Sequence, residues 1–132
     1  MKPLLWAFLV AVSLVNAADV ESNVLVKSSA SWDGTPLPAY PKEAPEITVL
    51  KITIPPHSKL AVHEHPIINV GYLVKGELKV VGENNQSKTL KAGDALIEMV
   101  HQWHYGENTS DEAAEIVVVY AGTKESPLSI KR

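Results

Sequence analysis

The sequence predicts an all-β domain, built either as a closed barrel or as a double-sheet jelly roll. No window of the 132 residues shows a sustained helical stripe of apolar side chains. Short runs rich in β-branched residues recur instead, with Gly, Asn and Pro turn signals between them. Closed barrels and jelly rolls are favoured because they leave few strand edges exposed. Cys is absent, so we expect packing alone, without disulfides, to stabilise the domain.

The first 17 residues have the layout of a signal peptide. Lys2 supplies a positive charge, Leu4 to Val15 form an apolar run, and small or compact residues lead to a cleavage point after Ala17. The run is shorter than the roughly 20 residues that a bilayer span needs, so we expect no stable membrane anchor. The sequence therefore predicts a cleaved signal peptide over 1–17 and export, to the periplasm or the medium if the source is bacterial.

Residues 18–46 are expected to form an extended N-terminal arm. Proline lacks an amide donor and interrupts helices, and this segment contains four prolines at short intervals, Pro36, Pro38, Pro41 and Pro45. Trp32 and Tyr40 are expected to pin the arm onto the domain. The arm can also cross to a neighbouring copy, which makes a homodimer one candidate assembly.

From residue 47 onward the pattern changes to short strands, and we assign 47–122 to the barrel. A hairpin turn is expected at 82–85, and 123–132 is expected to be a loose C-terminal tail. The predicted strands are 47–54, 72–75, 77–81, 87–91, 95–99 and 115–120.

The composition gives no sign of a nucleic-acid partner. Charged residues make up 20% of the chain and the formal net charge is −3. Neither a polybasic arm nor a strongly acidic tail is present, so the sequence predicts no nucleic-acid partner.

The histidines carry the most specific chemical signal. His63 and His65 are two residues apart, so in a strand both imidazoles project from the same face. His104 is the natural third donor from a separate part of the barrel. Three histidines with open positions suit Fe, Mn, Ni, Zn or Cu, without choosing among them. The alternative is chance, because a His-x-His pair also occurs on surface strands.

Two motifs extend this signal and resemble those of a small single-domain cupin over residues 47–121. The first cupin motif places a His-x-His pair, then a glutamate, then a closing glycine, and the second ends on a histidine followed by an asparagine. The matching positions are His63, His65, Gly76, Gly93, His104 and Asn108. The resemblance implies a cupin-type jelly-roll β-barrel that holds one divalent transition metal.

The sequence also departs from the cupin motifs. Asn69 occupies the position of the glutamate ligand, and an amide oxygen is a neutral and weaker donor than a carboxylate. His57 and His101 replace the two motif glycines, and Met99 replaces the usual proline. Asn69 and His101 are candidates for a fourth ligand or a supporting group, whereas His57 follows two prolines in a turn and is expected at the surface.

Three further residues are candidates for lining the cavity, namely Tyr72, Glu98 and Trp103. Glu98 has the same strand parity as Leu96, which would direct it inward, although a charge facing solvent is the expected placement. No general acid or base is evident from the sequence.

The sequence leaves three functional hypotheses. The first is an exported metal-binding cupin with a three-histidine site that binds or acts on a small molecule; an enzyme of this kind would be metal-dependent and dioxygenase-like. The alternative is a non-catalytic jelly-roll module that binds a small molecule without metal. The third is a structural protein whose main role is its dimer. The substrate, the metal and turnover itself stay open.

Overall fold

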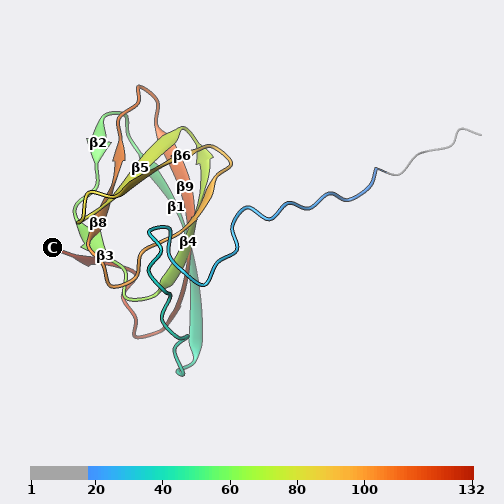
Figure 1. Ribbon diagram of the computed structural model, residues 1–132, viewed down its shortest axis with the longest axis vertical. Coiled ribbons are helices and arrows are strands. Elements are labelled where there is room, and N and C mark those ends of the chain that lie inside the picture. Colours follow the sequence, from blue (N-terminus) through green and yellow to red (C-terminus); the bar gives the residue numbers. More distant parts are fainter. Residues whose placement is uncertain (1–17) are drawn as a thin grey trace, which may run out of the picture.

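The computed structural model describes residues 18–132, and the predicted signal peptide lies outside this range. The described residues form two antiparallel sheets, which confirms the all-β prediction (Figure 1). One sheet has the order β1-β9-β4-β7, and the other has the order β10-β3-β8-β5-β6 with β2 paired to β8. The strands are β1 (Pro45–Ile54), β2 (Ser58–Lys59), β3 (His63–Glu64), β4 (Ile68–Lys75), β5 (Glu77–Gly82), β6 (Ser87–Lys91), β7 (Ala95–Ile97), β8 (His104–Asn108), β9 (Ala114–Thr123) and β10 (Ile130–Lys131). Within the described part of the chain, no helix is both long and apolar enough to span a bilayer.

Strand β9 is the centre of the first sheet and shows why these residues form a barrel. It pairs with β1 over ten residues, from Pro45 opposite Thr123 to Ile54 opposite Ala114, and with β4 on its other side. Its side chains alternate between buried and more exposed, so every second residue faces the opposite sheet. The buried core between the sheets comprises Ile54, Ile67, Leu73, Leu78, Val80, Leu90, Leu96, Ala114, Ile116, Val118 and Tyr120.

The six predicted strands all appear, β6 with the predicted ends and the other five with altered ends, and four further strands were not predicted. Strand β4 begins at Ile68, earlier than the expected residue 72. Strand β8 was missed because its three buried positions are His104, Gly106 and Asn108, which give no apolar alternation. The C-terminal tail, expected to be loose, is attached through β10, which pairs with β3. This attachment makes β10 an edge strand of the second sheet, beside the strand that carries His63.

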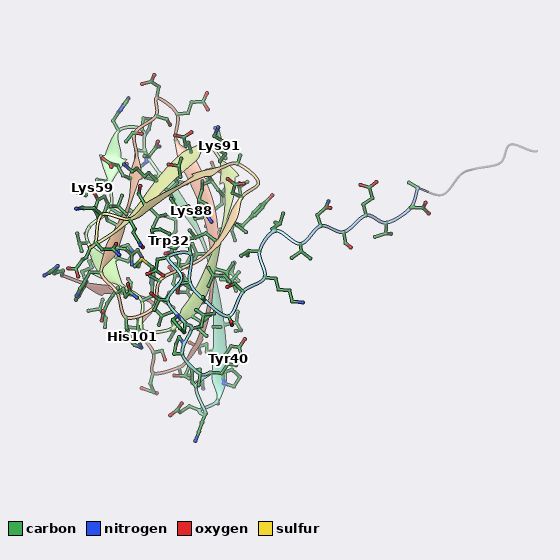
Figure 2. The ribbon with its side chains drawn as sticks, viewed as in Figure 1. Trp32, Tyr40, Lys59, Lys88, Lys91 and His101 are labelled. Carbon is green, nitrogen blue, oxygen red and sulfur yellow. The ribbon has the colours of Figure 1, made fainter. Side chains whose placement is uncertain are left out.

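The N-terminal arm touches the barrel through Trp32. Its backbone amide donates to the carbonyl of Ile97, and its side chain packs against the core. Tyr40, in contrast, is 77% exposed and is not a comparable anchor. Figures 1 and 2 show the arm before residue 30 extending away from the barrel with its side chains in solvent.

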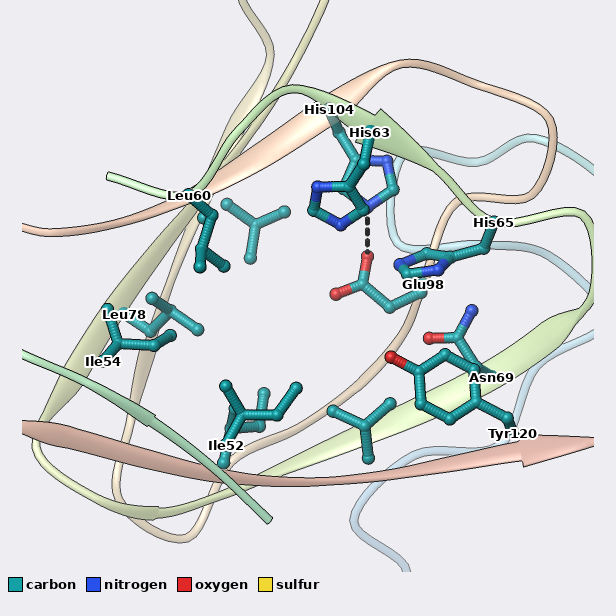
Figure 3. A pocket seen from close by; sticks show the side chains of 14 residues that line it. Ile52, Ile54, Leu60, His63, His65, Asn69, Leu78, Glu98, His104 and Tyr120 are labelled. Atoms are coloured by element: carbon teal, nitrogen blue, oxygen red, sulfur yellow. Dashed lines mark ion pairs between the residues drawn. The ribbon is translucent and has the colours of Figure 1, made fainter. Parts of the chain in front are cut away.

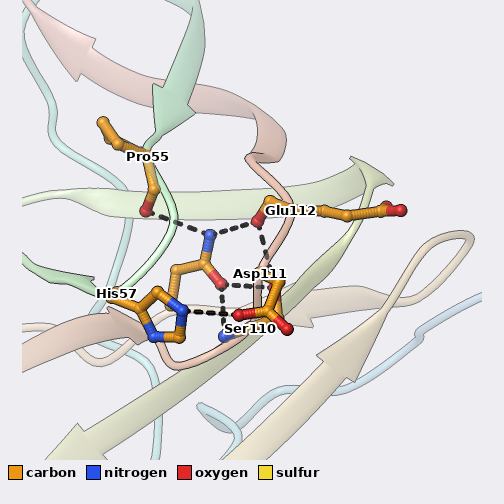
Figure 4. A network of polar contacts seen from close by, with 6 residues as sticks. Pro55, His57, Ser110, Asp111 and Glu112 are labelled. Atoms are coloured by element: carbon orange, nitrogen blue, oxygen red, sulfur yellow. Dashed lines mark hydrogen bonds and ion pairs between the residues drawn. The ribbon is translucent and has the colours of Figure 1, made fainter.

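One buried amide joins the ends of β1 and β8. Asn108 is fully buried, and its Nδ2 donates to the carbonyls of Ile54, Pro55 and Glu112 at 3.1, 3.1 and 2.8 Å. Figure 4 shows the contacts with Pro55 and Glu112. Its Oδ1 accepts from the backbone N–H and the hydroxyl of Ser110 at 3.0 and 2.8 Å. The asparagine of the second motif therefore holds the strand that carries His104.

Candidate metal centre

Strands β3 and β8 bring three histidines together inside the barrel (Figure 3). His63 is paired with His104 in the strand register, and His65 follows two residues after His63. The ring centroids are 4.9 Å apart for His63 and His65, 4.6 Å for His63 and His104, and 5.0 Å for His65 and His104. One nitrogen from each ring lies within 4.8 Å of the others. The convergence expected from the sequence is therefore present.

Backbone carbonyls fix the orientation of all three rings. The Nδ1 atoms of His63, His65 and His104 lie 2.8, 2.8 and 2.9 Å from the carbonyl oxygens of Ala61, Leu128 and Gln102, respectively. A carbonyl can only accept, so each neutral ring carries its proton on Nδ1 and keeps a lone pair on Nε2. Metal-binding histidines commonly use this arrangement, in which the second nitrogen is held by a hydrogen bond.

Burial keeps these imidazoles neutral. It is the main cause that lowers the pKa of His63 and His104, and it lowers the pKa of His65 to about 4. Their carbonyl partners act in the opposite direction, but burial dominates. At neutral pH the cluster therefore offers unprotonated nitrogens, which is the form that coordinates a metal.

Glu98 lies inside this cavity and not on the solvent face where its charge was expected. It directly follows β7, is 8% exposed, and its Oε2 is 3.4 Å from Nε2 of His104. Burial raises the pKa of the Glu98 carboxyl to about 7, while the nearby His63 opposes this shift. The inward parity shared with Leu96 was the correct signal in the sequence.

Three buried atoms facing this region have no hydrogen-bond partner, and they provide a test of fit for a metal. They are Nε2 of His104, Oε2 of Glu98 and Oδ1 of Asn69. Unsatisfied buried polar groups are costly unless a ligand or ion meets them. Imidazole nitrogens and carboxylate or amide oxygens are ligands that divalent transition metals accept. The residues therefore fit the metal implied by the cupin resemblance.

Asn69 lines the same cavity from β4. It is fully buried, and its Nδ2 donates to the carbonyl of Ile67 at 3.2 Å, which leaves Oδ1 free. Figure 3 shows Asn69, Glu98, His65 and Tyr120 at one end of the cavity.

The cavity itself is small and two-sided. Its volume is about 50 Å³, more than the roughly 15 Å³ that one water requires. The histidines, Asn69, Glu98 and Tyr120 form the polar end; the apolar end is lined by Ile52, Ile54, Leu60, Leu78, Val80, Ile116 and Val118. Tyr120 was not among the predicted lining residues, although its phase with Ile116 and Val118 in β9 places it inward.

Three other candidate residues lie elsewhere. Tyr72 is 41% exposed because it has the opposite parity to Asn69 and Leu73 in β4, so it does not line the cavity. Trp103 precedes the inward-facing His104 and borders hollows beside Glu83 instead. His101 is an exposed residue with a φ of 57° whose side chain is outside the cluster (Figure 2).

His57 is at the surface, as expected. It has a φ of 51°, and its Nε2 is 2.7 Å from a carboxylate oxygen of Asp111. The two histidines that replace motif glycines thus occupy left-handed backbone positions, which glycine adopts most readily.

Comparison with known proteins identifies the surrounding fold. The Cupin domain family model matches residues 50–120, a stretch that contains all three histidines of the cluster. No curated protein matches the sequence significantly.

Solved structures give the same fold. An oxalate oxidase bound to the substrate analogue glycolate is 22% identical with a TM-score of 0.55, over 64% of this chain and 45% of that chain. An RmlC-like cupin from Shewanella frigidimarina is 25% identical with a TM-score of 0.52, over 61% and 69%. An oxalate decarboxylase from Lactobacillus farciminis, in a formate complex, is 26% identical with a TM-score of 0.54, over 64% and 26%. The matched region thus spans less than half of the oxalate oxidase and about a quarter of the decarboxylase.

Proposed function

We infer that this chain, which belongs to the cupin domain family, binds one divalent transition-metal ion on His63, His65 and His104 and uses it to bind or transform a small molecule. The observation that carries this proposal is the set of three converging rings, two buried and that of His63 half-buried, whose Nδ1 atoms are all held by carbonyls. Fe, Mn, Ni, Zn and Cu all accept such ligands. A bound ion would supply a Lewis acid with open positions for a chelating ligand or dioxygen. Export and a homodimer stay predictions of the sequence.

The proposal predicts about one divalent ion per chain in protein purified without an affinity His tag. The double variant His63→Ala/His65→Ala should lose that ion, because two of its three imidazole ligands are gone. Elemental analysis after gel filtration measures both. The matched control is His57→Asn/His101→Asn, which changes two exposed histidines at left-handed positions that asparagine tolerates. Equal metal in wild type and the His63→Ala/His65→Ala variant would reject the ligand assignment.

A hollow next to the cavity suggests how a small molecule reaches the cluster. It has a volume of about 320 Å³ and shares His63, His65 and Tyr120 with the cavity. Leu50 and Leu128 contribute apolar walls on the sides of β1 and the C-terminal segment. This volume is within the range of small-ligand pockets.

The charge at this hollow favours a small carboxylate. Lys131 of β10 is among its lining residues and is close enough to His63 to lower the pKa of that ring. The oxalate decarboxylase and the oxalate oxidase, both named for a small carboxylate, are consistent with this choice. We therefore propose a small carboxylic acid as the ligand class.

For the metal-loaded protein, Lys131→Ala is expected to weaken glycolate binding by about two- to fivefold, because an exposed cation attracts an anion only modestly. Isothermal titration calorimetry at low salt measures the change. Lys88→Ala on β6, which also removes one exposed lysine, should leave the Kd unchanged. An equal effect of the two substitutions would argue against this entrance.

A further inference from the structure

We propose that Glu98 supplies a fourth protein ligand to the metal, as a carboxylate from the end of β7 that replaces the glutamate missing at position 69. This inference rests on the proposed three-histidine site. It adds a ligand at a position where neither cupin motif places a metal-binding residue.

Glu98 and His104 face each other inside the cavity. Because Nδ1 of His104 faces the carbonyl of Gln102, its Nε2 presents a lone pair toward the cavity. Oε2 of Glu98 lies 3.4 Å from this nitrogen, and neither atom has a hydrogen-bond partner. Two acceptors facing each other in a buried cavity repel, unless a cation or a proton lies between them.

The separation of these two atoms suits a shared metal ion. Two ligand atoms that each lie about 2.1 Å from one ion are about 3.0 to 3.4 Å apart, over angles from octahedral to tetrahedral, and coordination above four leaves positions open beside four protein ligands. The Glu98 carboxylate and the Nε2 of His104 already have this spacing.

A backbone hydrogen bond holds Glu98 beside position 69. The amide of Glu98 donates to the carbonyl of Asn69 at 3.0 Å, which joins the end of β7 to β4. The inward direction of Glu98 then places its carboxylate next to the neutral Asn69 side chain (Figure 3). Position 69 of β4 has no carboxylate, and Glu98, directly after the neighbouring strand β7, supplies one beside it.

The charges of the residues that line the cavity also favour Glu98 as a ligand. The three neutral imidazoles contribute no charge, and Asn69 contributes none. Among the residues that line the cavity, Glu98 is the one carboxylate. Partial neutralisation of a buried divalent cation therefore depends on Glu98.

The test is a titration of metal-free protein with Zn²⁺ in wild type, Glu98→Gln and Glu77→Gln. Glu98→Gln keeps the size of the side chain but removes the anionic oxygen, so it should raise the Kd at least about tenfold. Glu77 is exposed at the start of β5, and its substitution should leave the Kd unchanged. In a crystal structure of zinc-loaded wild type, an Oε atom of Glu98 should lie about 2.0–2.2 Å from the ion.

The zinc-loaded wild-type structure tests the inference even if Glu98→Gln folds poorly, and a second variant tests it in the opposite direction. Asn69→Glu/Glu98→Gln returns the carboxylate to β4. Its Kd for zinc should be lower than that of Glu98→Gln and approach that of wild type. An unchanged Kd in Glu98→Gln, or a zinc ion bound by the three histidines with both Oε atoms of Glu98 outside its coordination sphere, would overturn the inference alone. A wild type that takes up no zinc would overturn the proposed function as well.

Discussion

Asn108→Ala is expected to lower the free energy of unfolding by about 3 kcal/mol or more. The substitution removes the amide that serves three backbone carbonyls and accepts two hydrogen bonds from Ser110. These carbonyls belong to separate segments of the chain, and Asn108 is fully buried, so solvent cannot readily replace the lost donor. Urea unfolding of metal-free protein measures the difference.

Asn84→Ala is the matched control for this prediction. Asn84 is an exposed turn residue whose Oδ1 accepts from the backbone amide of Gln86 at 3.2 Å. Its loss should change stability by less than about 1 kcal/mol. Similar losses for the two variants would show that the Asn108 network does not hold the ends of β1 and β8 together.

In the metal-free protein, Glu98→Gln is expected to gain stability relative to wild type as the pH rises. The free energy of unfolding of the variant minus that of wild type should be about 2 to 3 kcal/mol larger at pH 8.5 than at pH 5. Burial raises the pKa of Glu98 from 4.5 to about 7, and each pKa unit corresponds to about 1.4 kcal/mol. The folded state therefore binds this proton more tightly than the unfolded state does. Its stabilising contribution is complete below pH 4.5 and is lost as the pH rises through 7.

Glutamine removes this titration, so the stability difference between the variant and wild type should grow with pH. The lowered pKa of His65 works in the opposite direction, because it destabilises the folded state as the pH falls from 6.5 toward 4. Both proteins carry His65, so its effect largely cancels in the comparison. Denaturant unfolding at both pH values, with chelator present, measures the difference. A stability difference independent of pH would contradict a buried, titrating Glu98.

The sequence predicts the sheets well where one strand face is apolar. Strand β9, with Ile116 and Val118 directed inward, is clear from its pattern because the buried face of the barrel is filled by such side chains. Strand β8 gives no such pattern, since its inward positions belong to His104, Gly106 and Asn108 and serve the site and its support. Tertiary contacts, rather than local alternation, make it a strand.

The candidate site follows the same division. The spacing of His63 and His65 predicts a common face, and the second motif adds His104. The prediction for the placement of Glu98 was wrong because a lone carboxylate is usually exposed, whereas here burial raises its pKa to about 7 and so favours the uncharged carboxyl. Leu128 could not be predicted at all, because its backbone carbonyl reaches His65 only after the tail returns across the sheet.

X-ray absorption spectroscopy of the zinc-loaded wild type shows whether His63, His65 and His104 form the metal site, because it counts imidazole ligands around the ion. Three imidazoles per zinc are expected, with the same count in His57→Asn/His101→Asn. Zinc bound by one imidazole or none would show that His63, His65 and His104 meet in the barrel without serving as a metal site.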